Sequence, residues 1–174
     1  MSLDAMEPKW YALYTRPKFE KKVEDRLREA GFDVWLPMQS VVRQWSDRKK
    51  KVEVPLFSSY VFVRTSQNNL YHAVQIDGVA RTVGFNGAPA AIRDEQIEMI
   101  RKILAGPDAF EVEETDFFKG DPVEVVDGPL KGSEGVWVEW RGKKRVALRI
   151  EQLSQVLFVE VHAAFVKKLH NSDA

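Results

Sequence analysis

The sequence contains no cysteine among its 174 residues. This absence excludes disulfide bonds, thiolate metal sites and a cysteine nucleophile. No apolar run approaches the ~18–20 residues that a membrane-spanning helix requires. The first residues have neither the basic region nor the apolar core of a signal peptide. Hydrophobic residues make up 44% and charged residues 30% of the chain, so we expect a globular cytoplasmic protein with no membrane partner.

The residue patterns of an enzyme active site are also missing. The histidines at positions 72, 162 and 170 are scattered, without the spacing of metal ligands. The segment GPLKGSEG is not a phosphate-binding loop, because no Gly-Lys-Ser/Thr follows at the required offset. We therefore expect a protein that acts by binding, not an enzyme, with no cofactor and no metal site.

Charge is divided unevenly along a chain whose net charge is zero. Residues 1–104 carry 17 Lys/Arg and 13 Asp/Glu, a net charge of +4. Residues 105–174 carry 9 and 13, a net charge of −4. This division favours two units with different partners.

The first part of the chain alternates predicted strands and helices. Phe19, Val23 and Leu27 share one face of a predicted helix that follows Pro17 and stops at Gly31. A second short helix is expected after an asparagine cap, and Asn-Gly at 86–87 predicts a tight turn. The other elements are strands at 9–15, 32–37, 59–64 and 79–85, a hairpin at 40–57 with the basic tip SDRKKK, and a helix at 94–106.

Composition changes after this last helix. The segment PDAFEVEETD is acidic, and we interpret residues 106–116 as a linker. From Phe117 onward the strands are short and the turns are rich in Gly, Pro and Asp, which is typical of a small β-barrel. The predicted organisation is a mixed domain over 8–105, the linker, and a barrel over 117–170.

Four segments, taken in order, resemble the NusG family of transcription elongation factors between Trp10 and Leu169. They are WYALYTRPKFEKKVEDRLREAGFDVWLP, VPLFSSYVFVR, DGVARTVGFNGAPAAI and FKGDPVEVVDGPLKGSEGVWVEW. The resemblance implies an α+β fold. An NGN domain, an antiparallel sheet flanked by helices, precedes a KOW domain, a five-stranded SH3-like barrel. It also implies a monomeric elongation and antitermination factor that binds RNA polymerase.

The segment VPLFSSYVFVR contains a strand with two apolar faces. Alternation places Val61 and Val63 on one face and Tyr60 and Phe62 on the other. From the pattern alone, packing of these aromatic residues into the core is favoured. The resemblance instead implies a pocket for the clamp helices of the largest polymerase subunit, formed by Tyr14, Phe57, Tyr60 and Phe62. It further implies that the protein bridges the cleft, reaches the gate loop of the second-largest subunit through residues 69–72, and suppresses pausing or termination.

Basic residues at the start of the first predicted helix form a second candidate site. Resemblance to the relative RfaH implies that they contact the non-template DNA strand, by attraction to phosphates. The alternative is a solvated helix face with ion pairs to nearby carboxylates. The residues are Arg16, Lys18, Lys22 and Arg26.

The segment VEVVDGPLKGSEGVWVEW matches the KOW motif, whose loop includes Gly128, Pro129, Leu130 and Gly135. We expect a tight turn and a close backbone approach at the two glycines. Leu130 and Ser133 stand where general family members often have aromatic residues, which disfavours Rho and leaves the ribosome as KOW partner.

Ser58-Ser59 replaces the Pro-Gly of many general members. Together with the KOW loop, this departure favours a specialised paralogue, similar to RfaH or UpxY, that acts at specific operons. Two alternatives stay open. One is a general NusG that couples polymerase to Rho or the ribosome, and the other is a KOW-type RNA-binding or ribosome-associated protein.

Overall fold

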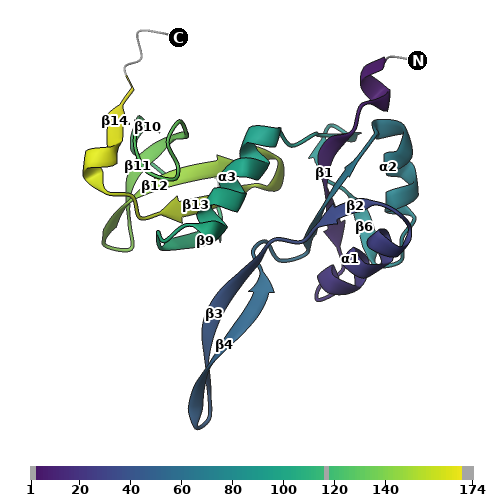
Figure 1. Ribbon diagram of the computed structural model, residues 1–174, viewed down its shortest axis with the longest axis horizontal. Coiled ribbons are helices and arrows are strands. Elements are labelled where there is room, and N and C mark those ends of the chain that lie inside the picture. Colours follow the sequence, from purple (N-terminus) through teal and green to yellow (C-terminus); the bar gives the residue numbers. More distant parts are fainter. Residues whose placement is uncertain (1–2, 116–117, 170–174) are drawn as a thin grey trace. The chain divides into compact units, whose positions relative to one another are not determined.

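The computed structural model describes residues 3–115 and 118–169 (Figure 1). The chain forms two compact units, residues 1–93 and residues 94–174. Within the described ranges, no helix is both long enough and apolar enough to cross a membrane.

The first unit contains a four-stranded antiparallel sheet with the strand order β2-β5-β1-β6. Two helices, α1 and α2, complete a mixed α and β unit, as the sequence predicted. The strands are β1 (Lys9–Thr15), β2 (Asp33–Trp35), β5 (Tyr60–Thr65) and β6 (Val79–Thr82); the helices are η1 (Leu3–Met6), α1 (Glu20–Glu29) and α2 (Gln67–Val74).

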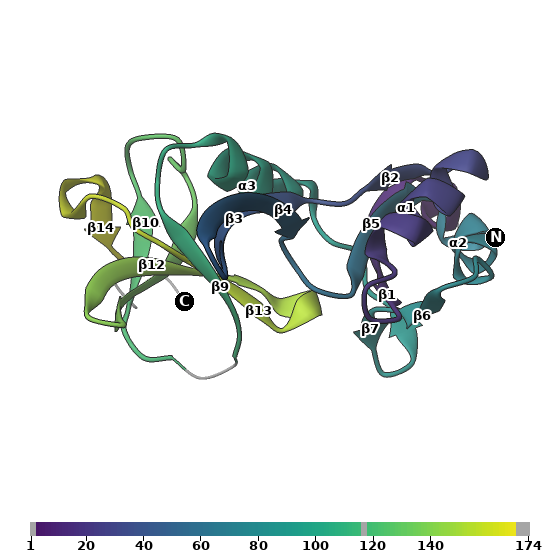
Figure 2. The same ribbon diagram turned by 90° about the horizontal axis from the view of Figure 1, so that it is seen from below.

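Both α-helices cover the same face of this sheet (Figure 2). Alternate residues of β1 and β5 point toward the helices, because successive side chains of a strand lie on opposite faces. Full burial of a valine or leucine side chain stabilises a fold by about 1.5–3 kcal/mol. The core on this face contains Tyr11, Leu13, Val61 and Val63 from the strands and Val23, Leu27, Leu70 and Ala73 from the helices.

The turns and helix ends of the first unit agree with the prediction, except at the start of α2. Gly31 follows α1 with a φ of +89°, the left-handed conformation expected at a helix end. Asn86 and Gly87 both have positive φ and join β7 (Gly84–Phe85) to β8 (Ala88–Pro89). The predicted asparagine cap of α2 is wrong, because Ser66 caps this helix by accepting a hydrogen bond from the backbone N–H of Asn69 at 3.1 Å.

A long hairpin of β3 (Met38–Trp45) and β4 (Arg48–Pro55) extends from the first unit (Figure 1). Trp45 pairs with Arg48, so only two residues form the turn. The predicted six-residue basic tip is therefore wrong: residues 48–51 are part of β4. All side chains from residue 42 to residue 51 are exposed.

The second unit is rich in β-structure, as predicted, and its sheet has the order β14-β10-β11-β12-β13-β9. Residues 117 and 170, the bounds of the predicted barrel, lie outside the described residues. The elements are α3 (Asp94–Ala105), β9 (Phe110–Glu114), β10 (Asp121–Val125), β11 (Glu134–Trp140), β12 (Lys143–Ile150), η2 (Glu151–Leu153), β13 (Gln155–Val159), η3 (Ala163–Phe165) and β14 (Val166–Lys168).

Helix α3 belongs to this second unit, whereas the sequence placed it in the first. Its residue Gln96 is buried and exchanges side-chain hydrogen bonds with Gln152, at 3.3 and 3.4 Å. Two amide side chains that satisfy each other in this way attach the helix to η2.

The predicted acidic linker is wrong over residues 110–114, which form strand β9 and pair with β13. Glu111 and Glu113 are two residues apart and therefore point to the same side of the strand. Arg141 contacts Glu113 at 2.6 Å, and Arg145 contacts Glu111 at 2.9 Å. The acidic composition that indicated a linker thus supplies partners for arginines of the second unit.

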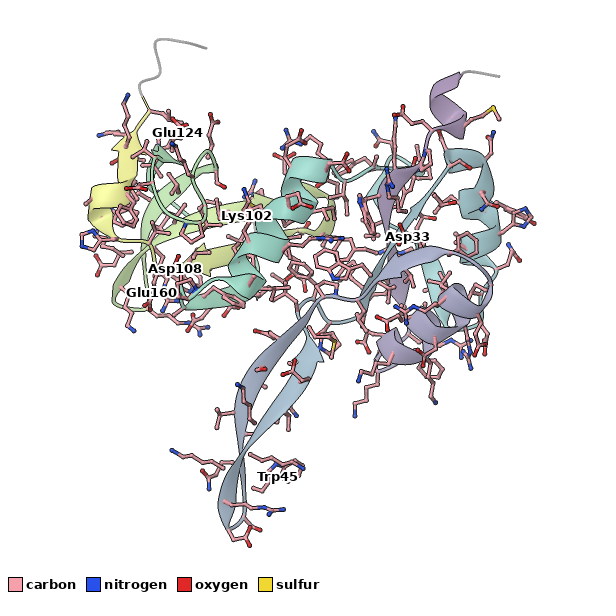
Figure 3. The ribbon with its side chains drawn as sticks, in the orientation of Figure 1. Asp33, Trp45, Lys102, Asp108, Glu124 and Glu160 are labelled. Carbon is pink, nitrogen blue, oxygen red and sulfur yellow. The ribbon has the colours of Figure 1, made fainter. Side chains whose placement is uncertain are left out.

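Arg145 lies at the centre of this charge network, with its side chain only 6% exposed. It also contacts Glu160 at 3.1 Å, and Lys143 contacts the same carboxylate at 3.1 Å (Glu160 is labelled in Figure 3). The hydrogen bond from Lys143, together with the charges of Lys143 and Arg145, lowers the pKa of Glu160 despite partial burial.

This network predicts a pH-dependent contribution of Glu160 to stability. Because the pKa of Glu160 in the folded state lies below its ordinary value of 4.5, its contribution is present above pH 4.5 and is lost as the pH falls through the folded pKa. We expect Glu160→Gln to lower the melting temperature at neutral pH, and the difference from the unmodified protein to close as the pH falls below 4.5 and through the folded pKa.

Thermal unfolding of both proteins across this pH range measures the effect. Glu139→Gln is the control, since Glu139 is exposed and forms a long ion pair, at 3.8 Å, with the exposed Lys144. If the difference in melting temperature between Glu160→Gln and the unmodified protein stays constant with pH, the lowered pKa of Glu160 is contradicted.

Candidate functional site

The sheet face opposite α1 and α2 carries a row of aromatic side chains. Tyr14 lies directly opposite Tyr60, and Trp35 lies directly opposite Phe62, so the members of each pair share a face. Phe57, in the loop before β5, contacts the ring of Phe62 at 6.0 Å between centroids. We call this set the aromatic face: Trp10, Tyr14, Trp35, Phe57, Tyr60 and Phe62.

One end of the aromatic face is buried. Phe57 is 1% exposed and Phe62 is 0% exposed. Trp35 packs against Phe62 at 5.6 Å and against Trp10 at 6.3 Å. Both rings are thus buried, and the implied role of Phe57 and Phe62 in a polymerase pocket stays a prediction. Their burial is the arrangement that the alternating pattern alone favoured.

The other end of the aromatic face is half-buried. The rings of Tyr14 and Tyr60 meet edge to face, with centroids 5.4 Å apart. Arg81 of β6 pairs with Tyr14 in the sheet, and its guanidinium lies 5.3 Å from the centre of the Tyr14 ring. Tyrosine combines a large apolar ring with a polar hydroxyl, so this pair can pack against an apolar partner and still tolerate water.

The loop before β5 is held firmly in place and positions Tyr60. The backbone N–H of Ser59 donates to the buried carboxylate of Glu20 at 2.9 Å, and the Ser59 carbonyl accepts from the Thr15 N–H at 2.8 Å. Ser59 adopts a φ of +67°, a left-handed conformation that costs a residue other than glycine roughly 1–2 kcal/mol. One hydrogen bond to a side chain and one to the backbone thus hold a strained residue next to the tyrosine pair.

The structure links three of the four predicted DNA-contacting residues through shared neighbours. Arg16 and Arg26 both contact Asp77, at 3.2 and 3.3 Å. Arg16 and Lys22 both lie over the ring of Phe19, at 5.5 and 5.0 Å from its centre. One carboxylate offsets the charge of two arginines, and exposed pairs of this kind contribute only about 0–1 kcal/mol. The remaining residue, Lys18, is exposed and has a φ of +66°.

The KOW loop has the structural roles expected for its glycines. Gly128 adopts a φ of +82°, and a Cβ at Gly135 would come within 2.6 Å of the Ala147 carbonyl oxygen. Leu130 is only 2% exposed, so its side chain packs in the second unit, while Pro129 is exposed.

Sequence reasoning missed four residues of these sites. Trp10 and Trp35 belong to the aromatic face, and the alternation of β1 already placed Trp10 on the same side as Tyr14. Arg81 and Asp77 become neighbours of the predicted residues only through tertiary structure. Within the part of the chain that the structure describes, no cluster of His, Asp and Glu could hold a metal ion.

Comparison with known proteins gives one consistent result. The family described as "Transcription termination factor nusG" matches residues 8–101. The transcription termination/antitermination protein NusG of Pseudomonas aeruginosa is 27% identical over 179 residues, which covers 94% of this chain and 100% of that protein. NusG of Yersinia pestis is 28% identical, covering 95% and 98%. A solved structure of Thermotoga maritima NusG has 26% identity and a TM-score of 0.55, covering 95% and 99%.

The buried end and the half-buried end of the aromatic face predict different mutational costs. Phe62→Ala removes a fully buried ring, so we expect it to lower the free energy of unfolding by about 3–5 kcal/mol. Tyr60→Ala removes a half-buried ring, and we expect less than half of that loss. Urea unfolding of the two variants measures both values. Equal, small losses would show that Phe62 is not core.

The strain at Ser59 predicts a stabilising substitution. Glycine adopts a positive φ without steric cost, and its greater freedom in the unfolded chain offsets part of this gain. We expect Ser59→Gly to raise the free energy of unfolding by about 0.5–1 kcal/mol. Ser58→Gly, at the neighbouring exposed position without a positive φ, is the control and should be neutral or destabilising. A loss of stability in Ser59→Gly equal to that in the control would contradict the assigned strain.

Proposed function

Because the chain belongs to the NusG family of transcription termination factors, we propose that it is an elongation and antitermination factor that binds RNA polymerase in the cytoplasm. NusG-family proteins are non-enzymatic transcription factors, so the protein is not an enzyme, in agreement with the sequence analysis. The protein then acts through the surfaces that bind its partners.

The observation that supports the polymerase site is the half-buried pair of Tyr14 and Tyr60 on the aromatic face. We assign the contact with the clamp helices of the largest polymerase subunit to these two rings. Phe57 and Phe62 pack beside them as buried support. Aromatic residues lose little rotamer entropy on binding and bury a large area, which is why they dominate many interfaces. Arg81, over Tyr14, adds a cation at the edge of the site.

A second contact explains how binding favours elongation. Tyr71, on α2, is 66% exposed and lies within residues 69–72, the segment that the resemblance assigns to the gate loop. A protein that holds both sides of the polymerase cleft stabilises the closed enzyme and opposes pausing and termination. In this proposal Arg16, Lys18, Lys22 and Arg26 lie on a basic surface available to the non-template strand.

We further propose a specialised, operon-directed role. Leu130 is buried and Ser133 is small, so the KOW loop lacks the exposed aromatic residues expected for Rho. The ribosome is then the partner assigned to this loop.

Titration of the full chain against an isolated clamp-helix fragment of the cognate polymerase tests the assignment. Tyr60→Ala and Tyr14→Ala should each weaken binding at least about tenfold, which corresponds to a loss of about 1.4 kcal/mol. Calorimetry or fluorescence anisotropy gives the affinity, and thermal unfolding shows that each variant is folded.

Tyr71→Ala is the matched control, because it removes a more exposed tyrosine from α2 and the fragment contains no gate loop. Its affinity should stay unchanged. If Tyr71→Ala weakens binding as much as Tyr60→Ala does, the contact is not specific to the aromatic face. If no protein binds the fragment, the polymerase site is wrong.

A further inference from the structure

The hairpin of β3 and β4 concentrates positive charge on a thin ribbon. Between residues 38 and 55 the sequence contains five Lys/Arg and two Asp/Glu. The carboxylate of Glu53 accepts a hydrogen bond from the Ser40 hydroxyl on the neighbouring strand. In the described parts of the chain, none of the five cations takes part in an ion pair. The basic residues are Arg43, Arg48, Lys49, Lys50 and Lys51.

Strand pairing sorts these residues onto two faces. Trp45 pairs with Arg48 and Arg43 pairs with Lys50, so these four side chains share one face of the ribbon. We call it the Trp45 face. Lys49 and Lys51 belong to the opposite face, where they pair with Gln44 and Val42. Trp45 lies near the free end of the hairpin (Figure 3).

The arrangement of the Trp45 face is unfavourable for the protein alone. Arg43 and Lys50 are directly opposite each other, and like charges in this position are destabilising. Trp45 is 53% exposed. Lysine residues on an exposed strand can simply prevent aggregation between strand edges. That role accounts for the lysines of the opposite face, but not for an exposed tryptophan between arginines.

We propose that the Trp45 face binds single-stranded nucleic acid. The Trp45 ring stacks on a base, and Arg43, Arg48 and Lys50 contact the flanking phosphates. Aromatic stacking together with a basic track is the usual chemistry of sequence-tolerant single-strand binding. Residues two apart on a strand are separated by about 7 Å, so Arg43 and Lys50 lie about that far along the ribbon from Trp45, and Arg48 lies directly across from it. This inference does not depend on polymerase docking, because free oligonucleotides test it.

The experiment measures binding of the full chain to labelled single strands of about fifteen nucleotides, oligothymidine and oligouridine, by fluorescence anisotropy. A duplex of the same length and heparin are the competing polyanions. Three phosphate contacts predict a slope of about −2 for the logarithm of affinity against the logarithm of salt concentration. Trp45→Ala should weaken single-strand binding about tenfold, whereas Trp45→Phe should retain most of the affinity.

A pair of charge-matched variants separates the Trp45 face from general attraction. Arg43→Gln with Lys50→Gln removes two cations from the Trp45 face, and Lys49→Gln with Lys51→Gln removes two from the other face. The first variant should reduce the salt slope by about 1.4, and the second should change the affinity less than about twofold. Circular dichroism checks that the exposed substitutions leave the fold intact.

Each outcome decides the proposal. Tighter binding of either single strand than of duplex or heparin, with the expected differences between variants, supports it, and the preferred strand then identifies DNA or RNA as the source. Equal losses of affinity in the two charge-matched variants would show that the hairpin binds polyanions non-specifically, which would contradict a role for the Trp45 face. Unchanged binding by Trp45→Ala, or duplex and heparin binding as tight as single-strand binding, would overturn the proposal.

Discussion

The pairing of β1 with β5 is the interaction on which the first unit depends. Six residue pairs, from Lys9 with Thr65 to Tyr14 with Tyr60, set a single register between the two strands. This register sends one set of side chains into the core under α1 and α2 and the other set onto the aromatic face. A slip by one residue would exchange the two faces and expose the core. The stable core and the candidate binding surface therefore follow from the same hydrogen-bond ladder.

The aromatic face performs two tasks along its length. At the buried end, Phe57 and Phe62 contribute packing energy, while at the other end Tyr14 and Tyr60 remain half-buried and accessible. A binding ring held against rigid, buried neighbours loses little entropy on association. The loop at Ser59 serves the same purpose, because Ser59 is held by hydrogen bonds to the Glu20 carboxylate and the Thr15 backbone. The hairpin presents the contrasting case, since Trp45 is 53% exposed on a ribbon whose residues 42–51 are all exposed.

Local patterns in the sequence predicted much of this architecture. Alternation in β5, the helical spacing of Val23 and Leu27, and the Asn-Gly turn all depend on neighbours close in sequence. The prediction of an acidic linker was wrong because it rested on composition and not on the strand-like alternation of residues 110–113. The carboxylates of Glu111 and Glu113 contact an arginine about 30 residues away. The burial of Phe57 and Phe62 likewise depends on tertiary packing, including contact between Phe62 and Trp35 from a separate strand. Charge pairing of this kind cannot be inferred from local periodicity, whereas the alternation in β5 already favoured burial of Phe62.

Site-specific cross-linking tests the central claim most directly, since the absence of native cysteine allows one reactive position to be introduced without background. A photo-reactive group attached at Tyr60→Cys would be irradiated with the assembled cognate RNA polymerase. The same group at Arg149→Cys, an exposed position of β12 in the second unit, is the control. Our account predicts that the group at position 60 forms a cross-link to the clamp helices of the largest subunit and that the group at position 149 does not. Absence of that cross-link from position 60, with the variant folded and bound to polymerase, would contradict the assignment of the aromatic face as the polymerase site.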